Sequence, residues 1–185
     1  EVTVRILKSP ETARALLIGF PTIEAAGECV GSVINAGIIP GGMEMMDRYA
    51  IEAAEAFCHA GYPLDVEALL IVELDGPEVE VDYLIAEVER MATECGAVNV
   101  RASTSEEERM TFWAGRKAAF PAVGRLSPDY YCMDGTIPRY QLPVVLRRIA
   151  ELSEHYGLRV ANVFHAGDGN LHPLILYDAD RKSTR

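Results

Sequence analysis

The sequence lacks the features of an exported or membrane-spanning protein. It contains no apolar run long enough to cross a bilayer, and no basic segment followed by an apolar core opens it. A membrane-spanning helix needs about 20 predominantly apolar residues, and a secretory signal needs a basic start before its apolar core. We therefore expect a cytoplasmic protein without a membrane span.

Basic residues are scarce. The chain has 17 lysine and arginine residues against 28 aspartate and glutamate residues, which gives a formal net charge of -11. Nucleic-acid binding depends on basic side chains gathered into a patch. No such cluster occurs, so nucleic acid is not an expected partner.

Cysteine and glycine motifs are missing as well. The four cysteines include no CxxC pair or other metal-ligand spacing, so we expect buried free thiols in a reducing compartment. No GxGxxG follows a predicted strand, so the chain has no dinucleotide fingerprint of its own. The cysteines are Cys29, Cys58, Cys95 and Cys132.

Residues 1–103 predict one ferredoxin-like unit. Apolar runs predict four strands, and helical spacing between them predicts three helices, in the order β-α-β-(α)-β-α-β. Thr22 and Asp47 are predicted N-caps, and Gly37 is predicted to end the first helix. The segment from Glu44 to Asp47 reads as a strand end followed by a helix cap, so it is given no site role. The predicted strands cover residues 12–20, 38–46, 68–75 and 98–102.

Residues 104–185 predict a second, incomplete unit. Ser105 and Glu108 form a capping box that opens a helix. A loop over 121–129, a strand over 130–137, a helix from Leu142 to Tyr156 and a hairpin then give β-α-β-β. The expected fold is α+β, with antiparallel sheet or sheets, helices on one face and the second unit truncated at its C-terminus. The abrupt start at residues 1–4 and the polar residues 178–185 are typical of a piece of a longer chain.

Residues 162–177, NVFHAGDGNLHPLILY, predict a β-hairpin. Asp168-Gly169 between two β-prone runs is typical of a type I′ turn, which needs positive φ at both residues. That register places His165 directly opposite His172, with β-carbons about 4.5–5.5 Å apart. Two such imidazoles can share a divalent ion, or they simply cap the apolar face of a hairpin. Pro173 removes one ladder hydrogen bond and predicts a bulge or strand edge beside His172.

Three further residues have two interpretations each. Gly169 leaves space for a ligand or cofactor against the backbone, or serves the turn alone. Asn170 could hydrogen-bond a ligand, or it tolerates the turn conformation. Arg116 could grip a carboxylate with two hydrogen bonds. The simpler interpretation of Arg116 is that its stem lies along apolar surface with its head in water.

The eight residues HAGDGNLH at 165–172 resemble the signature of the C-terminal domain of FAD-linked oxidases. That family includes D-lactate dehydrogenase, D-2-hydroxyglutarate dehydrogenase and the flavoprotein of glycolate oxidase. Residues 115–139, GRKAAFPAVGRLSPDYYCMDGTIPR, look most like the glycolate oxidase branch. The resemblance covers nearly the whole chain, and it implies the substrate-binding or cap domain of a flavin-dependent 2-hydroxy acid oxidoreductase whose FAD-binding domain is absent from this sequence.

The resemblance also implies residue roles. It places the segment from Glu44 to Asp47 near the flavin side of the domain, although the strand end and helix cap already explain that segment. Glycolate would be oxidised to glyoxylate, with a hydride passing to N5 of FAD. Arg116 would hold the substrate carboxylate. Asn170 would hydrogen-bond the substrate or the flavin, and Gly169 would border the flavin. His165 and His172 would hold a divalent metal, namely Zn, Mn or Fe. A third metal ligand and the base would lie in a Gly-Glu-His-Gly segment outside this sequence, so this piece alone is predicted to be inactive.

The implied partners are a small 2-hydroxy acid, a second flavin subunit and an iron-sulfur subunit, with a homodimer as a further assembly. Through such subunits the protein would lie at the inner face of a membrane. D-lactate or D-2-hydroxyglutarate are alternative substrates. A non-catalytic ferredoxin-like binding or regulatory module is an alternative of another class, because fold alone does not decide function. A hydrolase with a His-Asp metal centre is a weaker third hypothesis, because it would need ligands that the sequence does not show.

Overall fold

The computed structural model describes residues 2–4, 6 and 9–180. Glu1 and residues 181–185, which belong to the two ends considered above, lie outside the described residues. The regular elements follow the apolar runs and helical spacings of the sequence. In chain order they are β1 (Thr12–Phe20), α1 (Ile23–Asn35), β2 (Gly42–Asp47), α2 (Arg48–Cys58), β3 (Ala68–Gly76), α3 (Glu78–Glu94), β4 (Asn99–Ala102), α4 (Glu106–Val123), β5 (Asp129–Cys132), β6 (Gly135–Thr136), a 3-10 turn (Arg139–Gln141), α5 (Leu142–Tyr156), β7 (Val160–Phe164), β8 (Asn170–Leu171) and β9 (Pro173–Tyr177).

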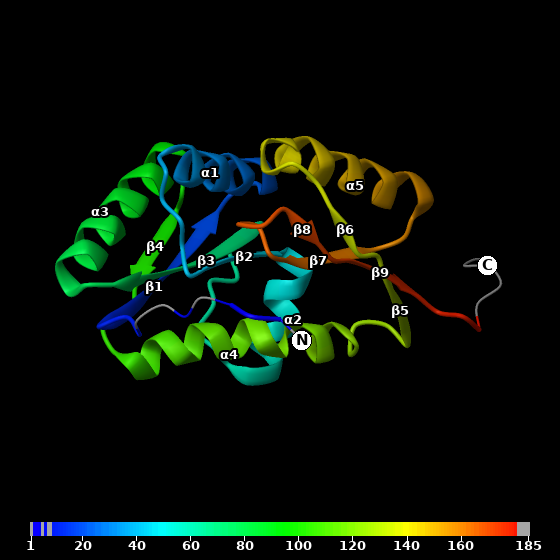
Figure 1. Cartoon of the computed structure of the whole chain (residues 1–185). Helices are drawn as coiled ribbons and strands as arrows, with labels where there is room; N and C mark the ends of the chain where they lie inside the picture. The colour runs from blue at the N-terminus through cyan, green and yellow to red at the C-terminus, as the bar shows by residue number, and fades with distance from the viewer. Residues whose placement is uncertain (1, 5, 7–8, 181–185) are drawn as a thin grey trace.

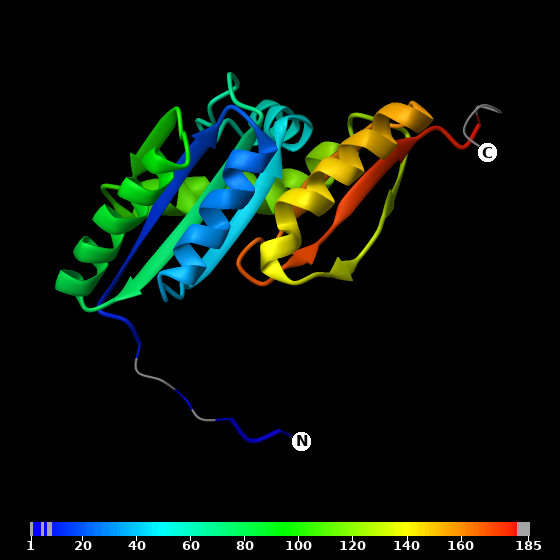
Figure 2. The ribbon, with the colours of Figure 1, turned by 90° about the horizontal axis from the view of Figure 1, so that it is seen from above.

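Seven strands form one antiparallel sheet in the order β4-β1-β3-β2-β7-β9-β5. The first four strands make one half and the last three make the other (Figure 2). The halves join where Met45 pairs with Phe164 and Met46 pairs with Val163. β6 and β8 pair in a separate two-stranded ribbon. The α+β class with an antiparallel sheet is confirmed.

Helices cover both faces of the sheet, not one as expected. α1, α3 and α5 lie above it in Figure 1, and α2 and α4 lie below. Two separate apolar clusters explain this arrangement. Side chains such as Phe20, Met45 and Phe164 pack toward the upper helices, whereas Leu17, Met46 and Phe112 pack in the lower layer. Strands buried on both faces carry nearly continuous apolar runs, as Ala68 to Leu74 does apart from Glu73.

Local signals for the helices are largely confirmed. The side chains of Thr22, Asp47 and Ser105 each accept a hydrogen bond from the backbone three residues on, and Gly37 has a φ of 79°. The capping box is only half formed, because the Glu108 carboxylate bonds to Thr104 instead.

The end of α4 differs from the expectation. The helix continues through Pro121 to Val123, where a loop was predicted. Pro121 faces solvent, while Ala122 and Val123 are buried. The packing of those two residues offsets the one helical hydrogen bond that Pro121 cannot donate.

The expectations about membranes and thiols have separate outcomes. Within the described ranges, no helix is long and apolar enough to span a bilayer. The four cysteines are free, as predicted. Only Cys29 is fully buried, and Cys132 is exposed, so the expectation of buried thiols was wrong for Cys132. Its strand, β5, is the outer edge of the sheet, where side chains lack a covering layer.

Candidate functional site

The site begins at a charged pair inside the lower layer. Arg116 of α4 is 8% exposed, and its Nε and Nη2 lie 2.9 and 2.8 Å from Oε2 of Glu44. Glu44 is in β2, where alternation turns Met43 and Met45 into the upper layer and Glu44 toward α4. Both charges are buried, and each is matched by the other, as burial requires. The interpretation of Arg116 as a surface side chain with its head in water is therefore wrong.

Glu44 also reaches the predicted hairpin. Its second oxygen, Oε1, lies 2.7 Å from Nδ1 of His165. A single buried carboxylate thus connects the arginine of α4 to the first histidine of the motif. Sequence reasoning missed Glu44. The available signal was a carboxylate at the centre of the otherwise apolar strand residues Met43 to Met46.

The two histidines lie close together. Their ring centroids are 5.3 Å apart, with the planes at 87°. Nδ1 of His172 lies 3.3 Å from Oδ1 of Asp134, and the ring contacts Phe120 edge-on at 6.1 Å. The His165 side chain is 43% exposed and that of His172 is 15% exposed. The imidazoles therefore stand at the open end of the site, and Glu44 with Arg116 forms its base.

The predicted register of the hairpin is wrong by two residues. His165 pairs with Asn170, through hydrogen bonds of 3.0 and 3.3 Å, and residues 166–169 form a four-residue loop. Of the two predicted turn residues only Gly169 has a positive φ, 71°, so the turn is not type I′. A shift of two preserves the face on which each side chain lies. The two histidines still converge, although they are diagonal neighbours.

Tertiary contacts of the returning strand explain the register. Gly135 and Thr136 pair with Leu171 and Asn170, and the Ile137 N–H donates to the Gly169 carbonyl. The ladder is interrupted at His172 before β9 begins at Pro173, in agreement with the predicted strand edge.

Gly169 and Asn170 have different surroundings. A β-carbon at Gly169 would collide with the carbonyl oxygen of Ile137, so the space beside Gly169 is filled by protein. Among the described residues, Oδ1 of Asn170 is buried and has no hydrogen-bond partner. A buried acceptor without a donor is costly. The Asn170 Oδ1 acceptor, directly after the loop, is thus left without a donor from the described residues.

The imidazoles fit part of a metal site. Nδ1 of each ring faces a carboxylate, which leaves each Nε2 for an ion, and carboxylate–histidine contacts of this kind are typical of metal-ligating histidines. The ring centroids are 5.3 Å apart, and Zn–N bonds are about 2.0–2.1 Å long. Within the described ranges no group of three His, Cys, Asp or Glu side chains could hold a metal. Among the described residues, the two imidazoles could therefore supply no more than two ligands, and any further ligand would have to come from another group.

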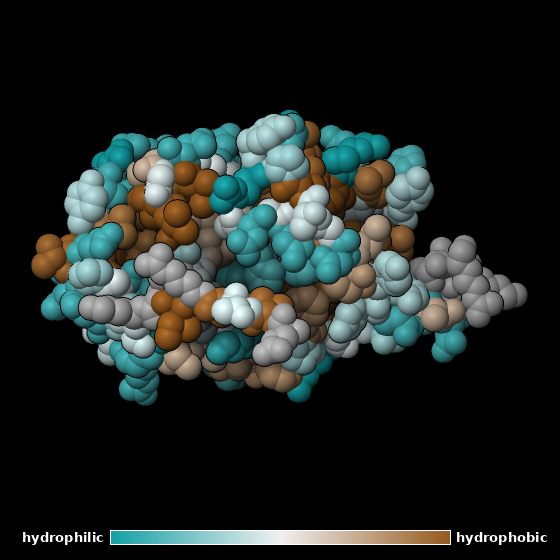
Figure 3. Space-filling model, viewed as in Figure 1, coloured by the Kyte–Doolittle hydropathy of each residue, from teal (hydrophilic) through white to brown (hydrophobic). Residues whose placement is uncertain are grey.

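The surface around the site is mixed in character. Figure 3 shows polar side chains in the middle of the face seen in Figure 1, near β8, with apolar patches on either side.

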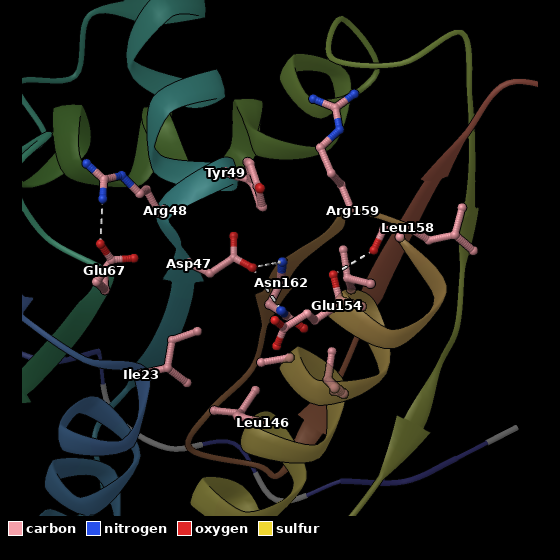
Figure 4. A pocket seen from close by; sticks show the side chains of 15 residues that line it. Ile23, Asp47, Arg48, Tyr49, Glu67, Leu146, Glu154, Leu158, Arg159 and Asn162 are labelled. Carbon is pink, nitrogen blue, oxygen red and sulfur yellow. Dashed lines mark hydrogen bonds and ion pairs between the residues drawn. The ribbon is translucent and has the colours of Figure 1, made fainter.

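A cleft of about 450 Å³ is lined by residues of α1, α5 and the start of α2 around Asp47 and Asn162 (Figure 4). At its base the Asp47 carboxylate accepts hydrogen bonds from the Asn162 backbone at 2.7 Å and side chain at 2.8 Å. Burial raises the pKa of Asp47 to about 6, although hydrogen bonds from Ala50 and Asn162 oppose the shift. Among the described residues, the hydrogen-bond partners of Asp47 are neutral donors, in contrast to those of Glu44.

Comparison with known proteins gives consistent results. The model of the family described as FAD linked oxidases, C-terminal domain, matches residues 9–185. The chain is 61% identical to the glycolate oxidase subunit GlcD of Escherichia coli (strain K12), covering 97% of this chain and 36% of that protein. It is 27% identical to the mitochondrial D-lactate dehydrogenase [cytochrome] of Kluyveromyces lactis, covering 100% and 33%. The chain thus spans about a third of these relatives' length.

Solved structures show the same fold. A p-cresol methylhydroxylase with substrate bound superimposes with a TM-score of 0.63 at 13% identity, over 95% of this chain and 40% of that one. At such low identity the likeness shows the fold alone.

Proposed function

Because the chain belongs to the family of FAD linked oxidases, C-terminal domain, we propose that it forms the substrate side of a flavin-dependent 2-hydroxy acid oxidoreductase. The proposed reaction is oxidation of glycolate to glyoxylate. The observation that carries the proposal is the continuous contact from Arg116 through Glu44 to His165 and His172. The 61% identity to a glycolate oxidase subunit favours glycolate as the substrate.

Oxidation of a 2-hydroxy acid requires a hold on the carboxylate and removal of the hydroxyl proton. Arg116 is proposed to provide the hold. A guanidinium has five N–H donors, and Glu44 accepts from Nε and Nη2 only, so donors remain for a substrate carboxylate. Asn170 Oδ1 is proposed to accept a hydrogen bond from the substrate or the flavin. Gly169 shapes the loop that carries Asn170.

His165 and His172 are proposed to hold a divalent ion, Zn, Mn or Fe, through their Nε2 atoms. Such an ion acts as a Lewis acid that lowers the pKa of the substrate hydroxyl. A third ligand and the base that takes the proton are proposed to come from outside this sequence. The hydride acceptor is FAD, which we propose is bound mainly by a separate domain, because residues 1–185 carry no dinucleotide fingerprint.

The assembly is proposed from the same comparison. The Escherichia coli relative is named as a subunit, and we propose that this chain also works in a complex with a second flavin subunit and an iron-sulfur subunit. We propose a cytoplasmic location, at the inner face of a membrane through those subunits. A homodimer is a further proposed assembly.

The test compares three histidine variants in the flavin-containing enzyme. His165→Ala and His172→Ala each remove one proposed ligand, and His155→Ala is the matched control, since His155 lies in the last turn of α5 against Tyr156. We expect the first two to lose bound metal and glycolate-dependent bleaching of the flavin, and the control to keep both. Flavin reduction that survives both substitutions would contradict the metal role.

Substrate choice is tested with the wild-type enzyme. Glycolate, D-lactate and D-2-hydroxyglutarate are compared by the rate of flavin reduction under anaerobic conditions. The highest kcat/KM is expected for glycolate. A preference for D-lactate would favour the activity named for the Kluyveromyces lactis relative. No flavin reduction with any of the three would favour a non-catalytic binding module.

A further inference from the structure

We propose that Glu44 is the positioning residue of this site: its two carboxylate oxygens set the orientation of the substrate-binding arginine and the tautomer of a metal-binding histidine together. This inference rests on the proposed function for the roles of Arg116 and His165. It adds a residue that neither the sequence motif nor the comparisons single out.

The two oxygens have separate partners. Oε2 lies 2.9 Å from Nε and 2.8 Å from Nη2 of Arg116, and Oε1 lies 2.7 Å from Nδ1 of His165. The Glu44 side chain is only 8% exposed, so burial limits the access of water to its oxygens. Each oxygen therefore has one partner and one task.

The contact with His165 selects a tautomer. A carboxylate can only accept, so Nδ1 of His165 must carry the proton that fills this hydrogen bond. The lone pair of the neutral ring then resides on Nε2, which is the atom left for a metal. Glu44 is thus the group that makes the two ring nitrogens of His165 unequal.

The contact with Arg116 fixes a direction. Bonds from Nε and Nη2 to one oxygen hold the plane of the guanidinium. Its remaining donors consequently point away from Glu44. Because β2 is paired on both sides, with β3 and β7, the carboxylate sits on a rigid element, and the arginine and the histidine keep a constant separation.

The chain contains a matched control. Glu73 of β3 lies on the neighbouring strand, and its carboxylate accepts from Arg109 of α4 at 2.5 Å and from the Trp113 indole. This second carboxylate also ties the sheet to α4, but its partners are an arginine and a tryptophan instead of a histidine. Glu73→Gln therefore reports the cost of weakening a carboxylate–arginine contact that involves neither Arg116 nor His165.

The experiment compares Glu44→Gln with Glu73→Gln in the flavin-containing enzyme. The glutamine amide can still accept from Arg116 with its oxygen. Its NH₂ group then faces Nδ1 of His165 and favours the tautomer with the proton on Nε2. We expect Glu44→Gln to bind Zn²⁺ or Mn²⁺ about 10–100-fold more weakly, the range for loss of such partners, and to show a raised KM for glycolate. Excess metal should restore kcat but not KM.

A direct readout does not depend on flavin chemistry. The ¹⁵N chemical shifts of the His165 ring distinguish its two tautomers, and they should change in Glu44→Gln and stay unchanged in Glu73→Gln. If Glu44→Gln fails to fold, Glu44→Asp is the second variant, because its shorter side chain keeps the charge but cannot reach both partners. Unchanged ring shifts in the Glu44 variants would overturn the proposal.

The outcomes separate this inference from the proposed function. If wild type reduces its flavin with glycolate, and Glu44→Gln matches Glu73→Gln in metal affinity and KM, the positioning role is refuted and the function stands. If no 2-hydroxy acid reduces the flavin of wild type, the function is refuted, and the ring shifts still decide whether Glu44 sets the tautomer.

Discussion

Two carboxylate–arginine pairs join the sheet to α4, and their difference identifies the site. Glu44 of β2 pairs with Arg116, and Glu73 of β3 pairs with Arg109, two helical turns earlier. The Arg116–Glu44 side chains are 10% and 8% exposed, while the Arg109–Glu73 side chains are 17% and 19% exposed. The first pair therefore lies in drier surroundings.

Each of the two glutamates has a second partner besides its arginine, and these second partners differ more than the arginine pairs do. The Glu73 carboxylate also accepts a hydrogen bond from the indole N–H of Trp113. An indole only donates, and it has no acid–base or metal-ligand chemistry. The Glu44 carboxylate also contacts His165, whose ring is partly exposed and contacts a second imidazole, that of His172. A buried ion pair alone is weak evidence for function. What the pair orients decides whether it is structural or part of a site.

The largest expected effect comes from removing the cation of each pair. Arg116→Met leaves Glu44 buried without a counter-ion, and loss of one partner of a buried pair costs about 3–5 kcal/mol. Arg109→Met should cost less, because that pair is nearer to solvent and the Trp113 indole still donates to Glu73. Urea denaturation measures both. Equal losses would mean that burial does not distinguish the two pairs.

A third carboxylate extends the comparison to the other face of β2. Asp47 is as buried as Glu44, but its partners are neutral donors, and its pKa is raised by burial to about 6. The folded protein therefore binds more protons than the unfolded chain between about pH 4 and 6. Stability from this group is present below about pH 4 and is lost as the pH rises through 6, by roughly 2–3 kcal/mol.

The measurement is the difference in unfolding free energy between wild type and Asp47→Asn across that range. Asparagine does not titrate, so the wild type should lose stability relative to the variant as the pH rises. Parallel profiles would contradict the raised pKa. The same comparison for Glu44 would not isolate a single group, because Arg116 and His165 contact it directly.

A smaller effect is expected at Gly115, which lies between the two arginines on α4. A β-carbon there would overlap the ring and hydroxyl of Tyr62, whose hydroxyl donates to the Phe112 carbonyl. Overpacking of this kind costs about 1–3 kcal/mol. Gly115→Ala should displace α4 and thereby raise the KM for glycolate, as well as lower stability. Gly31→Ala on α1 is the control, since a β-carbon added there would meet nothing within 4 Å.

The sequence predicted what is decided locally. The caps at Thr22, Asp47 and Ser105 depend on residues three positions apart, and those signals are visible in one turn of chain. The convergence of His165 and His172 was also predicted, because any even shift of register keeps them on one face. The roles proposed for these histidines and for Arg116 stay predictions.

Contacts between distant segments were not predictable in the same way. The register of the hairpin depends on pairing of Asn170 with Thr136, which no local turn rule contains. Glu44 meets Arg116 and His165 across separations of 72 and 121 residues. Within its own strand, Glu44 looks like an ordinary polar interruption. Only the positions of α4 and of His165 in the folded chain show what the Glu44 carboxylate contacts.

The smallest expected effect tests the same comparison at the surface. Arg48 lies 2.5 Å from Glu67, and both side chains are about half exposed, at 49% and 47%. Exposed pairs contribute little, and 1 M salt shortens the screening length to about 3 Å. Glu67→Gln should therefore leave the urea midpoint unchanged within error, at low salt and in 1 M NaCl. The difference between Arg116→Met and wild type should persist in 1 M NaCl, because buried pairs such as Arg116 and Glu44, 10% and 8% exposed, are screened much less. If salt abolished that difference, Glu44 would be solvated in solution and could not hold His165 in one tautomer.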